Sequence, residues 1–370
     1  MFKKIGELFT RLVSWIYQIP ILGVVVKSLV KVIKGFVRVI TWPFKIPMFR
    51  YVVKRIFQFI PVFFGVTIIL FLISYHLPGV DPIQMRFGER AVPAEVRAAF
   101  EEAHGLNEPW HIQYQMYLER MFNGNLGSSF ITGRAVLDML VERFPYTFRL
   151  ALVAVGLQAI LGIGAGIVSA VKRRTFWDVL VTMSTSIAVS LPVFWLGLIL
   201  QLVFGIWMQD ITGGTFFLPV TGASGPLPTW MYYVLPGITL AVVSMAYTAR
   251  IMRSQLLEIG SADYVRTAKA KGCSPARILW GHKMKNALIP VVTSMGVDFG
   301  VMLSGAIITE TVFNWPGIGF MMASAIQQRD FQVIIGATTV ILLLVLTISL
   351  IVDILYGFLD PRIRVAGGEE

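Results

Sequence analysis

The sequence predicts an all-α polytopic membrane protein with six transmembrane helices and with both chain ends in the cytoplasm. Composition is the first observation behind this: of 370 residues, 56% are hydrophobic and 14% are charged, and the mean hydropathy is +0.71. Soluble domains are usually about 45–50% apolar and about 25% charged. The excess apolar surface must face lipid, which excludes a soluble enzyme and a disordered chain. A single cysteine, Cys273, excludes a secreted disulfide scaffold.

Six apolar segments are long enough to cross the hydrocarbon core, which takes about 20 helical residues. We expect the spans at residues 56–75, 150–171, 179–208, 231–248, 286–308 and 331–352. The third segment is uncharged throughout and unusually long. We expect it to be tilted, to be kinked near Pro192, or to extend past the bilayer.

Basic residues predict the orientation, because they gather on the cytoplasmic side of membrane proteins. Most of the 32 lysines and arginines lie before the first span, in the link 172–174, in the loop 250–285 or in the C-terminal tail. These segments alternate with connections that carry few basic residues. Both termini are therefore expected in the cytoplasm, and the net charge of +11 needs no nucleic acid to explain it.

Residues 1–49 precede the first span and are predicted to form a basic amphipathic extension at the cytoplasmic membrane surface. Lys27, Lys31, Lys34 and Arg38 recur every three or four residues, which would place them on one face of a helix. Each contributes about 1 kcal/mol near anionic lipid. The alternative is a seventh span at 12–26, which is uncharged but short and contains a proline.

The remaining chain divides into three parts. Residues 50–144 hold the first span and a large extracytoplasmic loop, residues 145–358 form a core of five spans, and residues 359–370 form a cytoplasmic tail. Helix-like stretches at 92–103 and 110–121 interrupt the outer loop. A loop of this length is usually functional or folds into a small cap.

The basic loop 250–285 is the most informative segment, because turn signals separate two short helices in it. Ser261 can cap a helix that has Asp263 in its first turn, and Gly272 suits the left-handed position after its end. Ser274 and Pro275 then begin a second helix that leads into the fifth span. The loop therefore presents one short helix, at about 262–271, to the cytoplasm.

That short helix has the features of a docking element for another protein. Tyr264, Val265 and Ala268 would share its apolar face, with Arg266 and Lys269 elsewhere. An ordinary solvated basic loop is the alternative, but it would not need firm boundaries at both ends of the helix.

The same loop resembles that of a known family. Its run DYVRTAKAKG at 263–272, followed by NALIP at 286–290, is similar to the EAA loop of permease subunits of binding-protein-dependent ABC importers, and closest to the dipeptide/oligopeptide (nickel) class. Further segments agree in family order over about residues 50–362: PVFFG at 61–65, LPGVDP at 77–82, LNEPW at 106–110, GNLGS at 124–128, GRAVL at 133–137 and ETVFNWPGIG at 310–319. Arg266, Thr267 and Ala268 stand where the Glu-Ala-Ala of the motif would be, which removes any ion pair that depended on the glutamate.

The resemblance implies the type I ABC importer permease fold and a coupling role for the short helix. In such permeases this helix sits in a groove of a cytoplasmic ATPase subunit, and closure of two ATPases on ATP switches two permease chains between inward-open and outward-open states. The expected partners are a second, related permease, two ATPase subunits, an extracellular binding protein and membrane lipids, with no nucleic acid. Carried over by position, the coupling contact would comprise Tyr264, Val265, Arg266, Thr267, Ala268, Lys269 and Gly272.

The resemblance further implies a transport subunit rather than an enzyme, in a prokaryotic plasma (inner) membrane. No Gly-x-x-x-x-Gly-Lys-Ser/Thr phosphate loop occurs in the sequence, so ATP and Mg²⁺ would be bound by the partner ATPases and no cofactor by this chain. The implied substrates are di- or oligopeptides, and the same class of permease also moves nickel chelates, glutathione and oligosaccharides.

Two other classes of function remain as alternatives. A secondary transporter or channel would show inverted repeats and broken helices with charged sites at mid-membrane, whereas this sequence has no internal repeat and one acid in mid-span. An intramembrane enzyme would need a catalytic pattern. The four histidines form no metal-binding motif, and no Gly-x-Ser-x-Gly elbow occurs.

Asp298 and Glu310 are the candidate residues of the translocation pathway. Asp298 lies within the fifth predicted span and Glu310 near its end, and carboxylates that faced lipid would cost several kcal/mol. Asp298 would line the pathway and meet the amino group of a peptide, or else be a paired structural residue. Glu310 would line the same pathway, or serve the adjacent turn at 315–317 as a cap partner.

Overall fold

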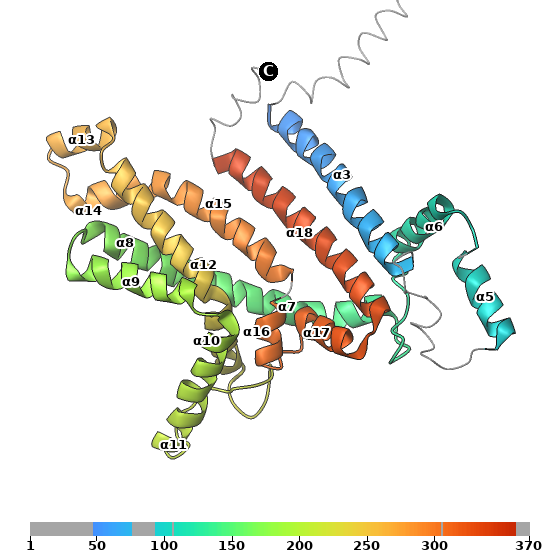
Figure 1. The fold of residues 1–370 in the computed structure, drawn as a ribbon. Coiled ribbons are helices and arrows are strands. Elements are labelled where there is room, and N and C mark those ends of the chain that lie inside the picture. Colours follow the sequence, from blue (N-terminus) through green and yellow to red (C-terminus); the bar gives the residue numbers. More distant parts are fainter. Residues whose placement is uncertain (1–46, 76–92, 106, 305, 360–370) are drawn as a thin grey trace, which may run out of the picture. The chain divides into compact units, whose positions relative to one another are not determined.

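The computed structural model describes residues 47–75, 93–105, 107–304 and 306–359, which are almost entirely helical (Figure 1). The predicted extension 1–49 lies outside these ranges apart from its last three residues, which begin helix α3 (Pro47–Tyr75). The tail from residue 360 also lies outside them. The chain divides into two units, Met1–Gln58 with Asp360–Glu370 and Phe59–Leu359. The packing described below concerns the second unit.

Six helical segments of the described chain are long and apolar enough to cross a membrane, as expected. They are Val52–Ile73, Val136–Val171, Val193–Ile211, Thr229–Ile259, Pro275–Leu303 and Phe331–Val352. The second is longer than expected, because helix α7 (Val136–Leu157) starts within the predicted outer loop and contains Pro145. The fifth span ends earlier than expected at its C-terminal end. Helix α15 (Met284–Leu303) stops at Leu303, and Ile307 begins the separate helix α16 (Ile307–Val312).

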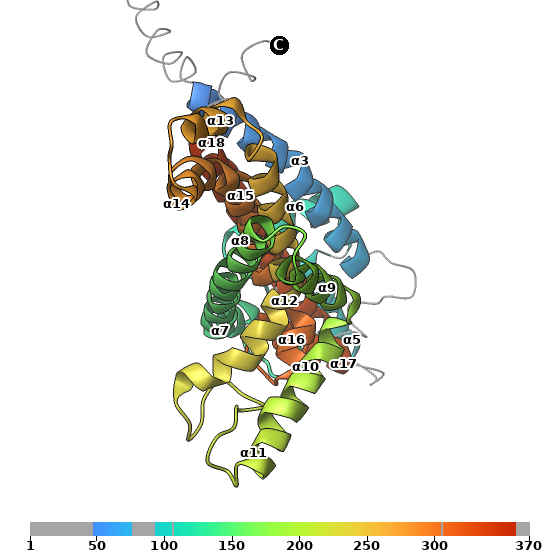
Figure 2. The same ribbon diagram turned by 90° about the vertical axis from the view of Figure 1, so that its left-hand side faces the viewer.

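The long third apolar segment is broken at Pro192, which is one of the three possibilities that the sequence leaves open. Helix α9 (Phe176–Ser190) ends one residue before Leu191, and α10 (Val193–Leu200) starts directly after Pro192. Leu191 and Pro192 both have ψ of 132°, which is extended backbone. Proline has no N–H to donate and disfavours helical geometry in the residue before it. The chain therefore changes direction at this point, and α10 leaves the line of α9 (Figures 1 and 2).

Beyond α10 the third span continues through a π-helical turn, η3 (Gln201–Trp207), into α11 (Met208–Ile211). Similar π-helical turns interrupt the second span at η2 (Gln158–Ile163), before α8 (Gly164–Val171), and the fifth span at η4 (Ile278–Lys283). Such turns are rare and often occur at functional sites.

Helix α12 (Thr229–Ile259) forms the centre of the bundle and contacts α7, η2, α8, α9, α10 and α15. Glycines in the second span allow its close approach. A Cβ at Gly162 would lie 3.0 Å from the Met245 carbonyl, and one at Gly166 would lie 2.7 Å from the Ala249 carbonyl. Buried Met252, Leu256 and Val291 lie in the apolar core between α12 and the start of α15.

The outer loop contains the two helices that the sequence predicts, α5 (Ala94–His104) and α6 (Trp110–Phe122). Tyr114 of α6 shares a hydrogen bond of 2.8 Å with Thr67 of α3, which ties the loop to the first span. The residues after α6 are bound to the junction between α17 (Ile318–Gln328) and α18 (Phe331–Leu359). Ser129 Oγ donates to Asp330 Oδ2 at 2.5 Å, and Gln332 Nε2 donates to the Leu126 carbonyl at 2.7 Å.

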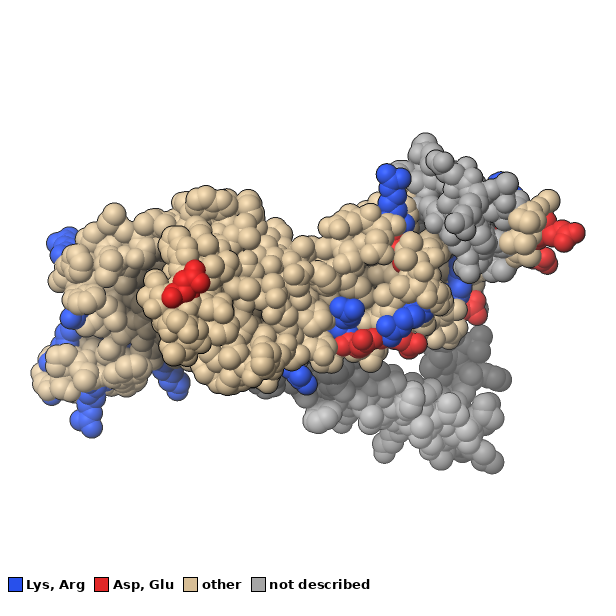
Figure 3. All heavy atoms as spheres, turned by 90° about the horizontal axis from the view of Figure 1, so that it is seen from below, with Lys and Arg blue, Asp and Glu red and all other residues tan. Residues whose placement is uncertain are grey.

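Charge is distributed unevenly over the surface (Figure 3). Lys and Arg gather at the left end of the face shown, the end that carries α8, α13 (Asp263–Ala270) and α14 (Pro275–Arg277) in Figure 1. A broad surface with one acidic patch follows, and basic and acidic residues appear together towards the right end. This arrangement fits a belt of lipid contact bounded on the cytoplasmic side by basic residues.

Candidate functional site

The loop after α12 folds as a short, well-bounded helix. Helix α13 runs from Asp263 to Ala270, within the predicted range. Gly272 has φ of +74° and ends the helix as expected, and the Ser274 hydroxyl caps α14 by accepting from the Arg277 N–H at 3.4 Å. The predicted Ser261 cap is wrong: its hydroxyl donates to the Glu258 carbonyl at 2.7 Å. The Ser261 hydroxyl thus adds a bond to a carbonyl at the end of α12 that the Ser261 N–H also contacts, and Ala262 takes the cap position of α13.

One face of α13 is buried in the chain itself. Val265 and Ala268 are buried and pack against Ile278 of η4, with Ala262 and Cys273 at the edge of the cluster. This contact joins the short helix to the start of the fifth span. The orientation of α13 is therefore fixed by apolar packing rather than left to a mobile loop.

Tyr264 does not share this apolar face, contrary to expectation. Its side chain is exposed, and its hydroxyl accepts a hydrogen bond from Asn286 Nδ2 at 2.9 Å. The buried stripe is only as wide as the pair Val265 and Ala268, so a residue beside it reaches the surface. The phenol finds a polar partner there, as Tyr hydroxyls commonly do.

The other predicted contact residues form an exposed polar and basic face. Arg266, Thr267, Lys269 and Gly272 are all exposed. Arg266 lies 3.5 Å from Asp263, and both side chains are mostly in solvent, so this ion pair contributes little to stability. The face is available to bind another molecule.

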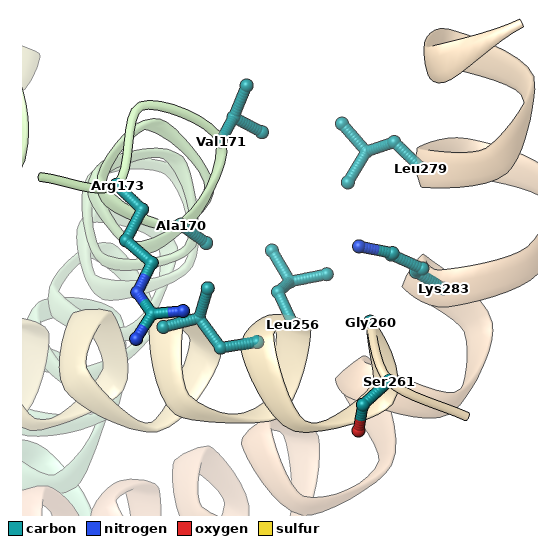
Figure 4. A pocket seen from close by; sticks show the side chains of 9 residues that line it. Ala170, Val171, Arg173, Leu256, Gly260, Ser261, Leu279 and Lys283 are labelled. Atoms are coloured by element: carbon teal, nitrogen blue, oxygen red, sulfur yellow. The ribbon is translucent and has the colours of Figure 1, made fainter. Parts of the chain in front are cut away.

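A cavity of about 320 Å³ lies behind α13, between the end of α8, the end of α12 and η4 (Figure 4). We call it the basic cavity, because it has two cationic lining residues and no acidic one. Its lining consists of Ala170, Val171, Arg173, Leu256, Leu257, Gly260, Ser261, Leu279 and Lys283. The cavity touches the chain segments that enter and leave the α13 loop.

An ion pair that the sequence reasoning missed joins α12 to the start of α9. Asp178 accepts from Arg253 Nε at 2.9 Å and from Arg253 Nη2 at 3.0 Å. Ser169 of α8 donates to the same carboxylate at 2.5 Å, and the Arg174 backbone N–H donates at 2.9 Å. These bonds, above all those from Arg253, hold the pKa of the Asp178 carboxyl well below its usual range. The available signal was an acid at the edge of an apolar segment, just after the basic link 172–174.

Asp298 lies within the bundle and is hydrogen-bonded across it. Gln158 of η2 donates through Nε2 to Asp298 Oδ2 at 2.6 Å and to Thr248 of α12 at 2.9 Å. Gln158 is fully buried, and its Oε1 has no hydrogen-bond partner in the described part of the chain. Asp298 itself is only partly buried. Part of the residue therefore remains exposed.

Glu310 is fully buried and serves neighbouring backbone and side-chain donors. Thr147 of α7 donates to its Oε1 at 2.8 Å, and the Phe320 backbone N–H donates to its Oε2 at 3.0 Å. Phe320 lies in the first turn of α17, so the carboxylate occupies the position of an N-terminal cap. Glu310 is not accessible to a substrate in this conformation, and it does not lie together with Asp298.

The six spans define a multi-pass helical membrane protein, and a short, well-bounded helix lies in its basic loop. Within that class, the chain belongs to the family described as binding-protein-dependent transport system inner membrane component. The profile of that family matches residues 162–365, and the profile of its N-terminal part matches residues 48–151.

Relatives with assigned functions align with this chain over almost their whole length. The di/tripeptide transport system permease protein DppB of Pseudomonas aeruginosa is 38% identical over 322 residues, with 82% of this chain and 96% of the relative covered. The dipeptide permease DppB of Escherichia coli K12 is 33% identical, with the same coverage of both chains. The glutathione permease GsiC of Escherichia coli O6:H1 is 36% identical, with 82% of this chain and 95% of the relative covered.

Solved transporter structures are similar at lower identity. An amino acid ABC transporter with histidines matches with a TM-score of 0.45, covering 59% of this chain and 93% of that chain. The inward-facing MetNI methionine transporter matches with a TM-score of 0.44, covering 62% of this chain and 97% of that one. Both are 16% identical in sequence.

Membership of this family confirms the predicted fold class, transport function and multi-pass inner-membrane location. The chain is the membrane permease component of an ABC importer and not its ATPase. Importers of this family work with ATPase and substrate-binding partners.

Proposed function

We propose that this chain imports peptides delivered by an extracellular binding protein, by alternating access driven by two cytoplasmic ATPases that dock at α13. The partition of α13 into one buried and one exposed face carries the coupling part of this proposal. The buried pair Val265 and Ala268 joins the helix to the fifth span through Ile278. A displacement of α13 by a partner bound to its exposed face would therefore also move the fifth span.

The predicted contact residues divide into two roles on this basis. Tyr264, Arg266, Thr267, Lys269 and Gly272 are exposed and would contact the ATPase. Val265 and Ala268 are positioning residues, which hold α13 at the angle that the ATPase groove requires. An ATPase surface that fits this face would carry acidic or polar groups opposite Arg266 and Lys269.

Peptides are the substrate class that the relatives favour. Both DppB relatives carry di- or tripeptide names, and glutathione, the substrate in the name of the GsiC relative, is itself a small peptide. Asp298 would meet the ammonium group of such a substrate, since it is an acidic residue within the bundle that remains partly exposed. A second, related permease would complete the pathway, and Glu310 would contribute to it only in a conformation that opens the α16–α17 turn.

The coupling role is tested in vesicles that contain the full importer with its ATPases and binding protein. Arg266→Glu reverses charge on the exposed face, and Arg277→Glu makes the same change on α14 as a matched control. Arg266→Glu is expected to reduce ATP-driven peptide uptake at least tenfold and to weaken ATPase retention, while Arg277→Glu leaves both near wild type. Equal uptake by both variants would contradict docking through this face.

Ala268→Asp tests the positioning role separately. A carboxylate at this buried site would be forced out of the contact with Ile278, so α13 would detach while the spans stay folded. Uptake should be lost with unchanged membrane yield.

Competition between a dipeptide and glutathione in the wild-type importer then identifies the preferred substrate. Failure of both to compete would leave the coupling proposal intact but overturn the peptide assignment.

A further inference from the structure

We infer that the basic cavity binds the phosphate headgroup of an anionic phospholipid from the cytoplasmic leaflet. This goes beyond the proposed transport function, because it assigns a ligand to a site behind the docking helix rather than on it. Four observations carry it: the charge of the lining, the free state of its cations, its place at the predicted cytoplasmic ends of three spans and its apolar walls.

The lining has an uncompensated positive charge. Arg173 and Lys283 come from opposite sides of the cavity, one after the end of α8 and one from η4 (Figure 4), and no acidic residue lines the space between them. Within the described residues, neither side chain makes a hydrogen bond or an ion pair with the protein. Two free cations that line one cavity attract an anion, and a phosphate can accept hydrogen bonds from an ammonium or a guanidinium group.

Lys283 in particular is directed into the cavity. Its Nζ lies over Gly260, where an added Cβ would come within 2.9 Å of it, and Figure 4 shows its side chain extending from η4 above the end of α12. Gly260 has no side chain that would displace the ammonium group from this position. The chain therefore holds a lysine in a confined space without giving it a counter-ion.

The cavity lies where three long apolar helical segments reach their predicted cytoplasmic ends. It is formed where the second and fourth spans end, at Val171 and Ile259, and where the fifth begins. Trp177 and Trp280, on the chain segments beside it, are 47% and 62% exposed, as is typical of aromatic residues at the headgroup level. Basic pockets between spans on the cytoplasmic side suit anionic headgroups.

Apolar side chains distinguish a lipid from a free anion. Val171, Leu257 and Leu279 line the same space as the two cations, so the glycerol and the first part of the acyl chains would lie on apolar surface. The volume of about 320 Å³ is at the lower end of the range for small-molecule sites, enough for the headgroup with the chains continuing into the bilayer. A zwitterionic lipid would add a cation to a site that already has two.

The test measures lipid binding to the full importer complex by native mass spectrometry, with phosphatidylglycerol and phosphatidylcholine titrated in parallel. The wild type should prefer phosphatidylglycerol, Lys283→Gln should lower that affinity about tenfold, and Lys283→Arg should retain it. Lys285→Gln, an exposed lysine two residues away that does not line the cavity, should behave as wild type. Because Lys283 makes no polar contact with the described protein, Lys283→Gln should melt at the wild-type temperature in lipid-free detergent.

Three results would overturn the assignment. Unchanged phosphatidylglycerol preference in Lys283→Gln and in an Arg173→Gln/Lys283→Gln double variant would show that the lipid binds elsewhere. Displacement of phosphatidylglycerol by excess inorganic phosphate would assign the site to a free anion. Loss of the lipid whenever the ATPases are bound would assign the two cations to an acidic segment of the partner.

Discussion

Arg253 and Asp178 form a two-point ion pair that fastens the start of the third apolar segment to the end of the fourth span. The two N–H groups of the guanidinium bind one carboxylate oxygen each, at 2.9 and 3.0 Å. Asp178 is buried and Arg253 is partly exposed, so the pair has little competition from water on one side. Because α12 leads directly into the α13 loop, this pair holds the base of that loop in place.

Asp178→Asn should destabilise the cytoplasmic half of the bundle, because its NH2 group replaces one of the two carboxylate oxygens that accept from Arg253 and leaves Arg253 without its counter-charge. We expect the melting temperature of the purified importer to fall by several degrees. Arg253→Lys should have a smaller effect in the same direction, since lysine keeps the charge but not the two-point geometry. Melting temperatures of both variants equal to wild type would show that the pair is energetically neutral.

The same pair should make no pH-dependent contribution to stability near neutrality. The pKa of Asp178 is lowered in the folded protein, so its contribution is fully present above the unfolded pKa of about 3.9 and is lost only as the pH falls through the folded value. The difference in melting temperature between wild type and Asp178→Asn should therefore be constant from about pH 5 to pH 8. A difference that vanished within this window would mean that the carboxyl is not held ionised by Arg253.

Glu310→Ala should unfold the outer end of the bundle rather than impair transport selectively. It removes the acceptor of Thr147 and of the Phe320 N–H, and each buried donor left without a partner costs about 1–3 kcal/mol. Gly317→Ala should act in the same direction, because its Cβ would meet the Glu310 carboxylate. The melting temperature and the membrane yield of both variants measure this loss of stability. Stable Glu310→Ala protein that fails to transport would instead place Glu310 on the substrate pathway.

Asp298→Asn separates a role in the pathway from a role in packing. Asparagine keeps an oxygen that can accept from Gln158, so folding should be retained while the negative charge is lost. We expect uptake of peptides with a free amino terminus to fall about tenfold or more, and uptake of amino-terminally blocked peptides, where they are transported, to change little. Asp298→Ala loses the bond to Gln158 as well as the charge, so it serves as the variant in which both the pathway role and the packing role are disturbed. Normal uptake by Asp298→Asn would leave Asp298 a structural residue.

Asp330→Ala should loosen the segment after α6 on the extracytoplasmic side. The Asp330 carboxylate accepts from Ser129 and from the Phe130 backbone N–H at 3.2 Å, so its removal frees the chain between α6 and α7. A protease added from outside should then cut residues 123–135 several times faster than in wild type. Asp138→Ala, an exposed acid on α7, should leave the cleavage rate unchanged, and equal rates for both variants would contradict the role of Asp330.

Local signals explain why the boundaries of α13 could be predicted. Gly272 at positive φ and the Ser274–Pro275 start depend on residues next to them in the sequence. The cap at Ser261 was wrong for a reason that is also local, because two helix ends compete for one hydroxyl and the carbonyl of α12 binds it. The prediction that Tyr264 shares the apolar face of α13 was wrong, because the spacing of apolar residues shows where that face points but not how many residues it includes.

The sequence by itself determined the membrane class, the six spans, their orientation and the positions of the short helices, because hydropathy, charge asymmetry and turn residues act over short distances along the chain. Only the tertiary structure decided which polar residues meet. Asp178 is paired with Arg253, Asp298 with Gln158, and Glu310 with Thr147, in each case from a different helix. The basic cavity is likewise defined by residues from three helical segments. Such partners depend on how helices rotate and approach one another in the bundle, and no local pattern in the sequence encodes that geometry.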